Sequence, residues 1–311
     1  MWNVLKCCQT SSYDMATATG YSQDLAVSIC EDLLAKLHKL GSEILTKIGW
    51  IKLTEGKERY KHFKDNGFKW LEEDYEHEGF RAVYCERLFV TRAEITCYIL
   101  SIFESKGWLP NLLYDTTYKS RTLRVASFGC GPGSDLAGFE AFYSNMKVRY
   151  SQSLQAEKPS MSESHYSRVL KCIQEAKIES ILGYDSAKGW SSYLEVLGYS
   201  FCHQVIDHQF VIQMAPVDIV ILSYFAHNAH FSMPLDPTQR ILTVDGEKDS
   251  VRNWDILMQK SKLIIVLDTK GCMAPIFSLL RKRGFGAIVG MHDSNGREVA
   301  VHLWYRMDLW T

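Results

Sequence analysis

Short apolar runs rich in β-branched residues alternate with amphipathic segments through the last two thirds of the chain. These runs predict strands at 123–129, 180–185, 200–207, 217–223, 263–268, 286–291 and 298–305. Strands that are apolar almost throughout and separated by helices are typical of a parallel sheet covered on both faces. The last two runs are joined by HDSNGR, which is too short for a crossover helix and contains an Asn-Gly turn signal. The pattern therefore predicts an α/β fold with a seven-stranded, mostly parallel sheet and an antiparallel C-terminal hairpin strand.

The first third of the chain follows a helical pattern instead. Apolar residues recur there at helical spacing, beginning with Ile29, Leu33, Leu37 and Leu40. A long helix is predicted over 84–105, whereas the Ser-, Thr- and Ala-rich residues 1–20 predict a mobile tail. We therefore divide the chain into this tail, a helical N-terminal region over 21–120, and an α/β domain over 121–311.

A polar segment, 144–178, interrupts the alternation inside the α/β domain. Its first half is rich in Ser and charged residues and shows no apolar run. We expect an inserted loop followed by a helix, with part of the segment disordered. This insertion lengthens the chain between the first and second predicted strands.

The most informative motif is SFGCGPGSD at 127–135, which places a glycine-rich turn between the first strand and a predicted helix. Glycine is needed in such a turn for two reasons. It adopts backbone angles that other residues avoid, and it lets a ligand approach the main chain closely. Because ligands of open α/β sheets bind at the carboxyl ends of the strands, this turn is the first candidate for a binding site.

The spacing of the glycines indicates which ligand class fits. A dinucleotide fingerprint beginning at Gly129 would need glycine at 134, where the chain has Ser134, and the motif lacks the Lys-Ser/Thr pair of a phosphate-binding P-loop. The run G-x-G-x-G followed by Asp135 instead resembles motif I of the class I S-adenosylmethionine-dependent methyltransferases. The resemblance implies a Rossmann-like fold and S-adenosyl-L-methionine as cofactor.

The same resemblance implies which residues contact the cofactor. They are Phe128, Gly129, Cys130, Gly131, Gly133, Asp135, Asp185, Ser186, Asp207 and Ser223. Asp185 would accept both ribose hydroxyls, although an Asp at a strand–helix junction is also an ordinary helix N-cap. It lies much farther from the glycine turn than the roughly 20 residues of a compact unit, an excess that the insertion absorbs. Asp207 matches the place where such enzymes read the adenine amino group.

Residues after the fourth predicted strand would face the methyl acceptor in such a family. Catalytic roles are therefore implied for Tyr224, His227 and Asn228. A His or Tyr can take a proton from the acceptor and an Asn can position it, while many methyl transfers need little beyond alignment. The alternative is that His227 caps a helix and that the nearby His230 lies on the surface.

A narrower resemblance is to the eukaryotic enzymes that methylate large-subunit rRNA at uridine N3. Its counterparts here are the motif at 127–135, the insertion at 144–178, and Asp185 followed by Trp190. This slightly favours RNA as the methyl acceptor, with a small molecule or a protein as alternatives. A non-catalytic protein of the same fold, which binds the cofactor or serves as a scaffold, is the hypothesis from a different class.

Composition narrows the other possibilities. The chain has 311 residues, 46% of them hydrophobic, and a net charge of −1, so any nucleic-acid surface must be a local patch, for which the basic and aromatic stretch 57–70 is the candidate. The more common role of such a stretch is a solvated helix with one aromatic face docked on the core. No apolar run reaches the roughly 18 residues of a membrane span. Nine cysteines without CxxC spacing are typical of reduced thiols in a cytoplasmic or nuclear protein. The scattered histidines predict no metal site, and the oligomeric state stays open.

The helical region ahead of the first strand can reach the rim of the predicted binding site. We expect it to pack beside motif I and to help form the acceptor pocket, with Tyr84, Arg87 or Phe89 facing that pocket. Closure of this kind would exclude water and align the acceptor. The alternative is that these helices only cover the sheet.

Overall fold

A computed structural model describes residues 49–62, 70–105, 122–156, 165–223, 244–269, 286–292 and 298–305, together with 35, 39, 42, 43 and 46. The tail predicted at 1–20 lies outside the described residues. No helix within these ranges is long and apolar enough to cross a membrane.

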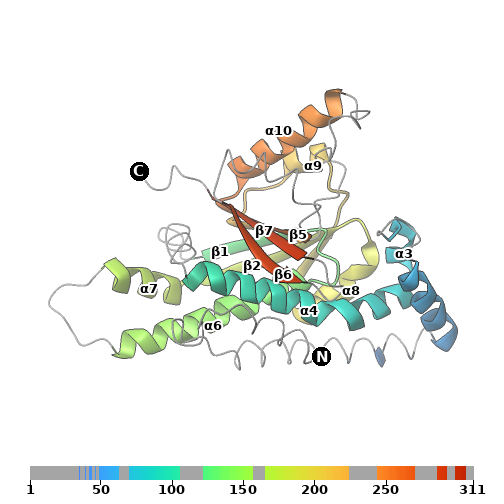
Figure 1. The fold of residues 1–311 in the computed structure, drawn as a ribbon, viewed down its shortest axis with the longest axis horizontal. Helices are drawn as coiled ribbons and strands as arrows, with labels where there is room; N and C mark the ends of the chain where they lie inside the picture. The colour runs from blue at the N-terminus through green and yellow to red at the C-terminus, as the bar shows by residue number, and fades with distance from the viewer. Residues whose placement is uncertain are drawn as a thin grey trace.

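Helices and strands alternate along the α/β part of the chain, as Figure 1 shows. The helices are α3 (Glu72–Glu76), α4 (Glu78–Ser105), α6 (Ser134–Ala156), α7 (His165–Glu175), α8 (Ser191–Leu197), α9 (His208–Gln213) and α10 (Val244–Lys260), with a 3-10 turn η2 (Lys188–Trp190). The strands are β1 (Thr122–Phe128), β2 (Lys177–Asp185), β3 (Ser200–His203), β4 (Ile219–Ser223), β5 (Leu263–Thr269), β6 (Gly286–His292) and β7 (Glu298–Tyr305). A further helical segment covers 49–61.

The strands form one sheet in the order β3-β2-β1-β4-β5-β7-β6. The first five of these pair in parallel, which confirms the prediction of an α/β fold built on a parallel sheet. β7 runs antiparallel to β5, and β6 pairs antiparallel with β7. The connection 293–297 lies outside the described residues, so the Asn-Gly turn there stays a prediction.

Both faces of the sheet are buried under helices. One apolar cluster joins α4, α6, α7 and α8 to the sheet, and a second joins α9 and α10 to its other face (Figure 1). Successive residues of β5 alternate between the two clusters: Leu263, Ile265 and Leu267 belong to the first, and Ile264 and Val266 to the second. This alternation follows from the two-residue period of a strand, and it explains why the strands read as continuous apolar runs.

The N-terminal helix α4 is part of this sandwich because it lies along α6 (Figure 1). The two backbones touch at Gly138. A Cβ atom added there would lie 2.3 Å from the carbonyl oxygen of Ala93 and 2.8 Å from the Cβ of Thr96. The absence of a side chain at Gly138 therefore sets how closely α4 approaches the α/β domain.

The segment 144–178 differs from its prediction at its beginning. Residues 144–156 continue α6 as helix instead of forming an inserted loop. Phe142, Met146 and Tyr150 recur every four residues, and all three are buried in the cluster that also contains apolar residues of α7. The many polar residues between them concealed this helical period. The predicted second helix is present as α7, and 157–164 lie outside the described residues.

Replacement of Gly138 by Ala tests the contact between α4 and α6. In an open helix this change stabilises by about 1 kcal/mol, because Ala has the higher helix propensity. Here we expect a loss of about 1–3 kcal/mol in the free energy of unfolding, since the methyl group overlaps the α4 backbone. Urea unfolding measures it, with Gln152→Ala on the exposed part of α6 as the control. A stabilised Gly138→Ala protein would contradict this packing.

Candidate functional site

The glycine-rich turn follows β1 directly and depends on left-handed backbone angles. Gly129, Gly131 and Gly133 have φ values of 65°, 51° and 81°. Residues with a Cβ seldom adopt these angles, which explains the G-x-G-x-G spacing. The amides of Gly129 and Cys130 both donate to the carbonyl oxygen of Tyr184 on β2, at 2.9 and 3.2 Å. The turn is thereby fixed to the carboxyl end of the neighbouring strand.

Asp185, the last residue of β2, reaches across to this turn. Its Oδ2 accepts the amide of Gly131 and its Oδ1 accepts the amide of Ala187, each at 2.9 Å. Burial raises the pKa of Asp185, and the two amide hydrogen bonds oppose that rise. Each carboxylate oxygen can accept a further hydrogen bond, so the side chain retains capacity for a ligand hydroxyl.

No described residue fills the space above Gly131. A Cβ atom built on this residue would meet no described atom within 4 Å, although the residue itself is partly buried. The Gly131 amide already donates to Asp185. A ligand can therefore approach the backbone of the turn here, at the residue whose amide binds the Asp185 carboxylate.

Three of the predicted cofactor residues point into the protein instead of toward that space. Phe128 is fully buried, with its ring 5.3 Å from the ring of Phe210. The buried thiol of Cys130 packs where a Cβ on Gly183 would lie, only 2.6 Å from its sulfur atom. The third, Asp135, is 1% exposed. These three side chains belong to the protein interior on which the turn packs.

Asp135 lies in the first turn of α6 and forms a buried hydrogen bond beside the glycine turn. The hydroxyl of Ser127 donates to its Oδ2 at 2.5 Å, and the amide of Leu136 donates to its Oδ1 at 2.9 Å. Burial raises the pKa of Asp135 to about 6, and the Ser127 hydroxyl partly opposes this. The carboxyl group therefore connects the end of β1 to the start of α6, the two elements that the turn joins.

Ser186 and Ser223 lie at the ends of β2 and β4. The third strand, expected over 200–207, ends at His203, so Asp207 lies between β3 and α9. The carbonyl oxygen of Ser186 lies 2.8 Å from Nε2 of His203, and the buried Ser223 ends β4. Asp207 is the N-cap of α9, because its Oδ1 accepts the amide of Phe210 at 2.8 Å. The predicted catalytic residues Tyr224, His227 and Asn228 lie outside the described residues.

The three candidates on α4 point to three different places. Tyr84 is buried, its hydroxyl accepts a hydrogen bond from Arg92, and its ring lies 5.5 Å from that of Trp190, just after β2. Phe89 is buried in the core, and the guanidinium of Arg87 lies 5.3 Å from the ring centre of Tyr60, away from the glycine turn. Tyr84 is therefore the member of this set that contacts the loop after Asp185.

Sequence reasoning did not identify Arg92. It lies eight residues after Tyr84 and so on the same side of α4, which is a signal that the helical period could have supplied. Burial raises the pKa of Tyr84, and the positive charge of Arg92 opposes this rise. The pair places a hydrogen-bonded cation and phenol at the boundary between the N-terminal helices and the site.

No protein-family model matches the sequence, and no curated protein matches it either. Several solved structures resemble the chain. Protein 1320 of Thermoplasma acidophilum is 11% identical with a TM-score of 0.34, over 65% of this chain and 86% of that one. A precorrin-6y C5,15-methyltransferase from Geobacter metallireducens is 9% identical with a TM-score of 0.33, over 64% and 88%. The N-terminal domain of EvdMO1, solved with SAH bound, is 12% identical with a TM-score of 0.32, over 63% and 79%.

Methyltransferases are thus among the structures that this chain resembles. TM-scores and identities this low carry no functional argument of their own. The strand order and the residues at the carboxyl ends of β1, β2 and β4 define the chemistry available at the site. Within the part of the chain that the structure describes, no group of three His, Cys, Asp or Glu side chains could hold a metal ion.

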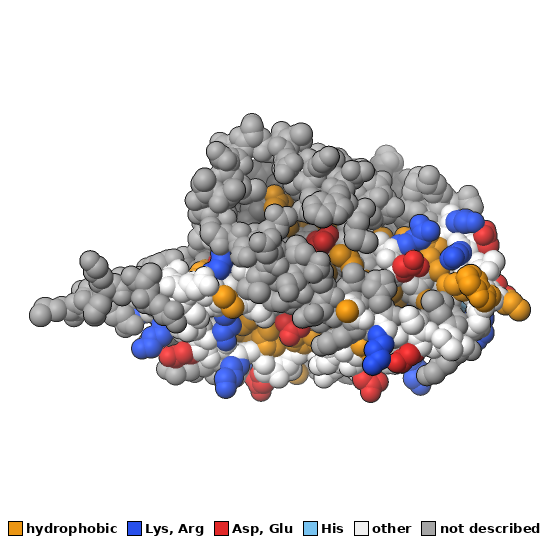
Figure 2. Space-filling model, turned by 90° about the horizontal axis from the view of Figure 1, so that it is seen from below, with side chains coloured by type: hydrophobic (Ala, Val, Ile, Leu, Met, Phe, Trp, Pro, Cys, Tyr) orange, Lys and Arg blue, Asp and Glu red, His pale blue; other side chains and the backbone are white. Residues whose placement is uncertain are grey.

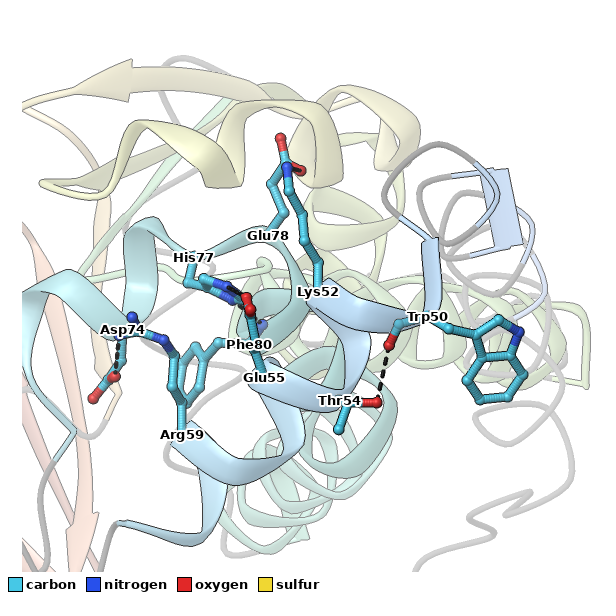
Figure 3. A network of polar contacts seen from close by, with 9 residues as sticks. All are labelled: Trp50, Lys52, Thr54, Glu55, Arg59, Asp74, His77, Glu78 and Phe80. Atoms are coloured by element: carbon cyan, nitrogen blue, oxygen red, sulfur yellow. Dashed lines mark hydrogen bonds and ion pairs between the residues drawn. The ribbon is translucent and has the colours of Figure 1, made fainter.

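The basic and aromatic stretch 57–70 is partly described, and two of its basic side chains are paired. Arg59 contacts Asp74 at 3.1 Å (Figure 3), and Lys61 contacts Glu58 at 2.7 Å. A groove of about 500 Å³ beside it is lined by Thr54, Glu55, Glu58, Arg59, His62, Leu71, Glu73 and Asp74. Four carboxylates face one Arg and one His there, which disfavours a phosphate backbone.

The helical segment 49–61 is attached to α3 and α4 by this network. Lys52 contacts Glu78 at 3.1 Å, and Glu55 contacts His77 at 3.2 Å (Figure 3). Acidic and basic side chains are also interspersed over the described surface in Figure 2. The described part of the N-terminal region is therefore a docked structural layer, and Trp50, 79% exposed, points away from its network.

The Asp135 carboxyl predicts a pH dependence of stability. The unfolded chain releases this proton near the ordinary pKa of 3.8, whereas the folded chain releases it only at about 6. The contribution of the group to stability is therefore complete below the lower value and is lost as the pH rises through the higher one. Two pKa units correspond to roughly 3 kcal/mol.

Other carboxyl groups titrate in the same pH range. The stability of wild type is therefore compared with that of a variant that lacks the Asp135 carboxyl group. Urea unfolding from about pH 4 to about pH 7 should show wild type losing roughly 2 kcal/mol relative to Asp135→Asn, because part of the full effect is already lost at pH 4. Ser127→Ala should move this loss to higher pH, because the Ser127 hydroxyl lowers the pKa of Asp135. If the free energies of unfolding of wild type and Asp135→Asn change in parallel with pH, the folded chain does not raise the pKa of Asp135.

Proposed function

We propose that the protein is an S-adenosylmethionine-dependent methyltransferase. The observation that carries the proposal is the bridge from Asp185, at the end of β2, to the amide of Gly131 in the turn after β1. The strand order reverses at β1, since β2 and β3 continue on one side and β4 and β5 on the other. In open α/β sheets, ligands bind outside the carboxyl ends of the strands at such a reversal.

The residues present fit an adenosyl ligand better than a phosphate-rich one. The turn lacks the spacing of a dinucleotide fingerprint and the Lys-Ser/Thr pair of a P-loop. The open space above Gly131 admits a ligand to the backbone, and the Asp185 carboxylate can still accept hydrogen bonds from ribose hydroxyls. The cofactor would supply an electrophilic methyl group on a positively charged sulfur atom.

The residues of this chain would then hold and align the reactants. Gly131 and Asp185 would bind the cofactor, and Asp207 would read the adenine while it caps α9. Ser223 would lie toward the methionine end. Tyr224, His227 and Asn228 would follow β4 into the acceptor pocket, to position the acceptor and to take its proton. Alignment is the main requirement of such a transfer.

The acceptor class is proposed from the sequence resemblance, which slightly favours RNA. A protein or a small molecule is the alternative, and the paired charges of the described N-terminal layer give RNA no additional support. A protein that binds the cofactor without turnover would share the same glycine turn. The cellular location proposed from the cysteine usage is the cytoplasm or nucleus.

Cofactor binding is tested by a pair of matched glycine variants. Gly131→Ala and Gly198→Ala both place a Cβ at positive φ, 51° and 80°, and neither Cβ meets a described atom within 4 Å. Each should lose about 1–2 kcal/mol of stability from backbone strain. Gly131→Ala should also weaken S-adenosylhomocysteine binding at least about tenfold, because its methyl group enters the ligand space.

Isothermal titration gives the dissociation constants, with Gly198→Ala, at the end of α8, as the control for strain. Asp185→Ala should weaken binding in the same assay, since it removes the proposed ribose acceptor. A wild-type protein that does not bind S-adenosylhomocysteine would refute the proposed function. Equal affinities for the two glycine variants would show that the ligand does not approach Gly131.

Turnover is tested separately with tritiated-methyl S-adenosylmethionine and fractions of RNA, protein and small molecules. We expect label in one fraction, with RNA the first candidate, and a large loss of transfer in Tyr224→Phe or His227→Ala if these residues act on the acceptor. Cofactor binding without label in any fraction would favour the non-catalytic alternative.

A further inference from the structure

The loop 186–190, which follows Asp185, is held by the N-terminal helices. The amide of Lys188 donates to Oε1 of Glu76, the last residue of α3, at 3.2 Å. Trp190 is 1% exposed, and its ring lies 5.5 Å from that of Tyr84 and 6.5 Å from that of Tyr75. Two residues of this loop are thus fixed by α3 and α4.

The residue between them is also pressed against α4. A Cβ atom on Gly189 would lie 2.0 Å from the guanidinium carbon of Arg81, so the Arg81 side chain packs flat on the loop backbone. Arg81 is 8% exposed and donates from Nη1 to the carbonyl oxygen of Tyr75 at 2.9 Å, which holds the guanidinium in place. Residues 188, 189 and 190 therefore each contact the N-terminal helices.

The other end of the loop is held by the Asp185 carboxylate. Its Oδ1 accepts the amide of Ala187, and its Oδ2 accepts the amide of Gly131. Contacts consequently run without interruption from Glu76 and Trp190, through the loop, to the carboxylate and then to the glycine turn. The direction of the Asp185 side chain depends on where the loop lies, because its two oxygens are bound to two different segments.

We propose that Glu76 and Trp190 are positioning residues for the cofactor, through which the N-terminal helices orient Asp185 and the glycine turn. The inference rests on the proposed function and deepens it, since it makes the N-terminal region part of the binding site without direct ligand contact. A loop held in its bound position before binding saves the free energy of ordering it, and this raises affinity. Loosening the loop should therefore weaken cofactor binding while leaving the fold intact.

A substitution at Glu76 tests the positioning role more specifically than one at Trp190, because the Glu76 side chain is exposed. Glu76→Ala removes the acceptor of the Lys188 amide, whereas Glu76→Gln retains a carbonyl oxygen that can accept it. Glu72→Ala, on the same short helix and also exposed, is the matched control. One lost hydrogen bond corresponds to an affinity loss of about fivefold.

The first readout is titration with S-adenosylhomocysteine. We expect Glu76→Ala to bind about fivefold more weakly than wild type, and Glu76→Gln and Glu72→Ala to bind within about twofold of wild type. Trp190→Phe should bind more weakly as well, because the smaller ring leaves part of the space beside Tyr75 and Tyr84 unfilled. Wild-type affinity in both Glu76→Ala and Trp190→Phe overturns the inference and leaves the proposed function intact, whereas absence of binding to wild type overturns both.

The second readout needs no cofactor and separates positioning from a general loss of stability. Amide hydrogen exchange of the ligand-free protein should be faster over 129–133 and 186–190 in Glu76→Ala than in Glu72→Ala, with equal midpoints of urea unfolding. Faster exchange confined to 186–190, with 129–133 unchanged, overturns the inference, since a looser loop would then leave the glycine turn unaffected.

Discussion

One carboxylate joins the two segments on which the site depends. Asp185 binds an amide of the glycine turn with one oxygen and an amide of its own following loop with the other. Hydrogen bonds to a charged acceptor are about twice as strong as neutral ones, and they partly offset the burial that raises the pKa of this group. A turn with three glycines at positive φ has little intrinsic order, so these external bonds give it a defined shape.

The surrounding architecture holds that carboxylate in place. β1 and β2 are paired in parallel along their length, so the turn and Asp185 emerge side by side at one edge of the sheet. The helices α6 and α8 bury one face of these strands, and α4 packs on α6 through Gly138. The N-terminal helices consequently belong to the same packed layer as the domain and reach its rim at Trp190.

The strands and the glycine turn could be predicted from the sequence because their signals are local. An apolar run at 123–129 corresponds to β1 at Thr122–Phe128, and three glycines in five residues require unusual backbone angles. The helix over 144–156 could not be predicted from local signals, since its buried residues are four apart and separated by polar ones.

The second limit on prediction from the sequence was the spatial arrangement of residues that lie far apart in the chain. The motif resemblance groups Asp135 with the cofactor residues, but which way a side chain at a helix N-terminus points depends on its partner, here Ser127. Phe89 and Tyr84 are both aromatic residues of α4, yet one lies in the core and the other beside Trp190. Only the packing of α4 on α6 decides between these places, and that packing is fixed by residues far apart in the chain.

The close contact at Gly138 also bears on how the protein is made. α4 leaves the ribosome before β1, and α6, the helix on which it packs, follows later. Until then the buried face of α4 that includes Leu88, Ile95 and Ile99 lacks α6 and the sheet, its partners in the finished fold. Early apolar segments that wait for a distant partner are where chains aggregate or recruit chaperones. The order of synthesis therefore leaves the side of α4 that packs on α6 uncovered until α6 has been made.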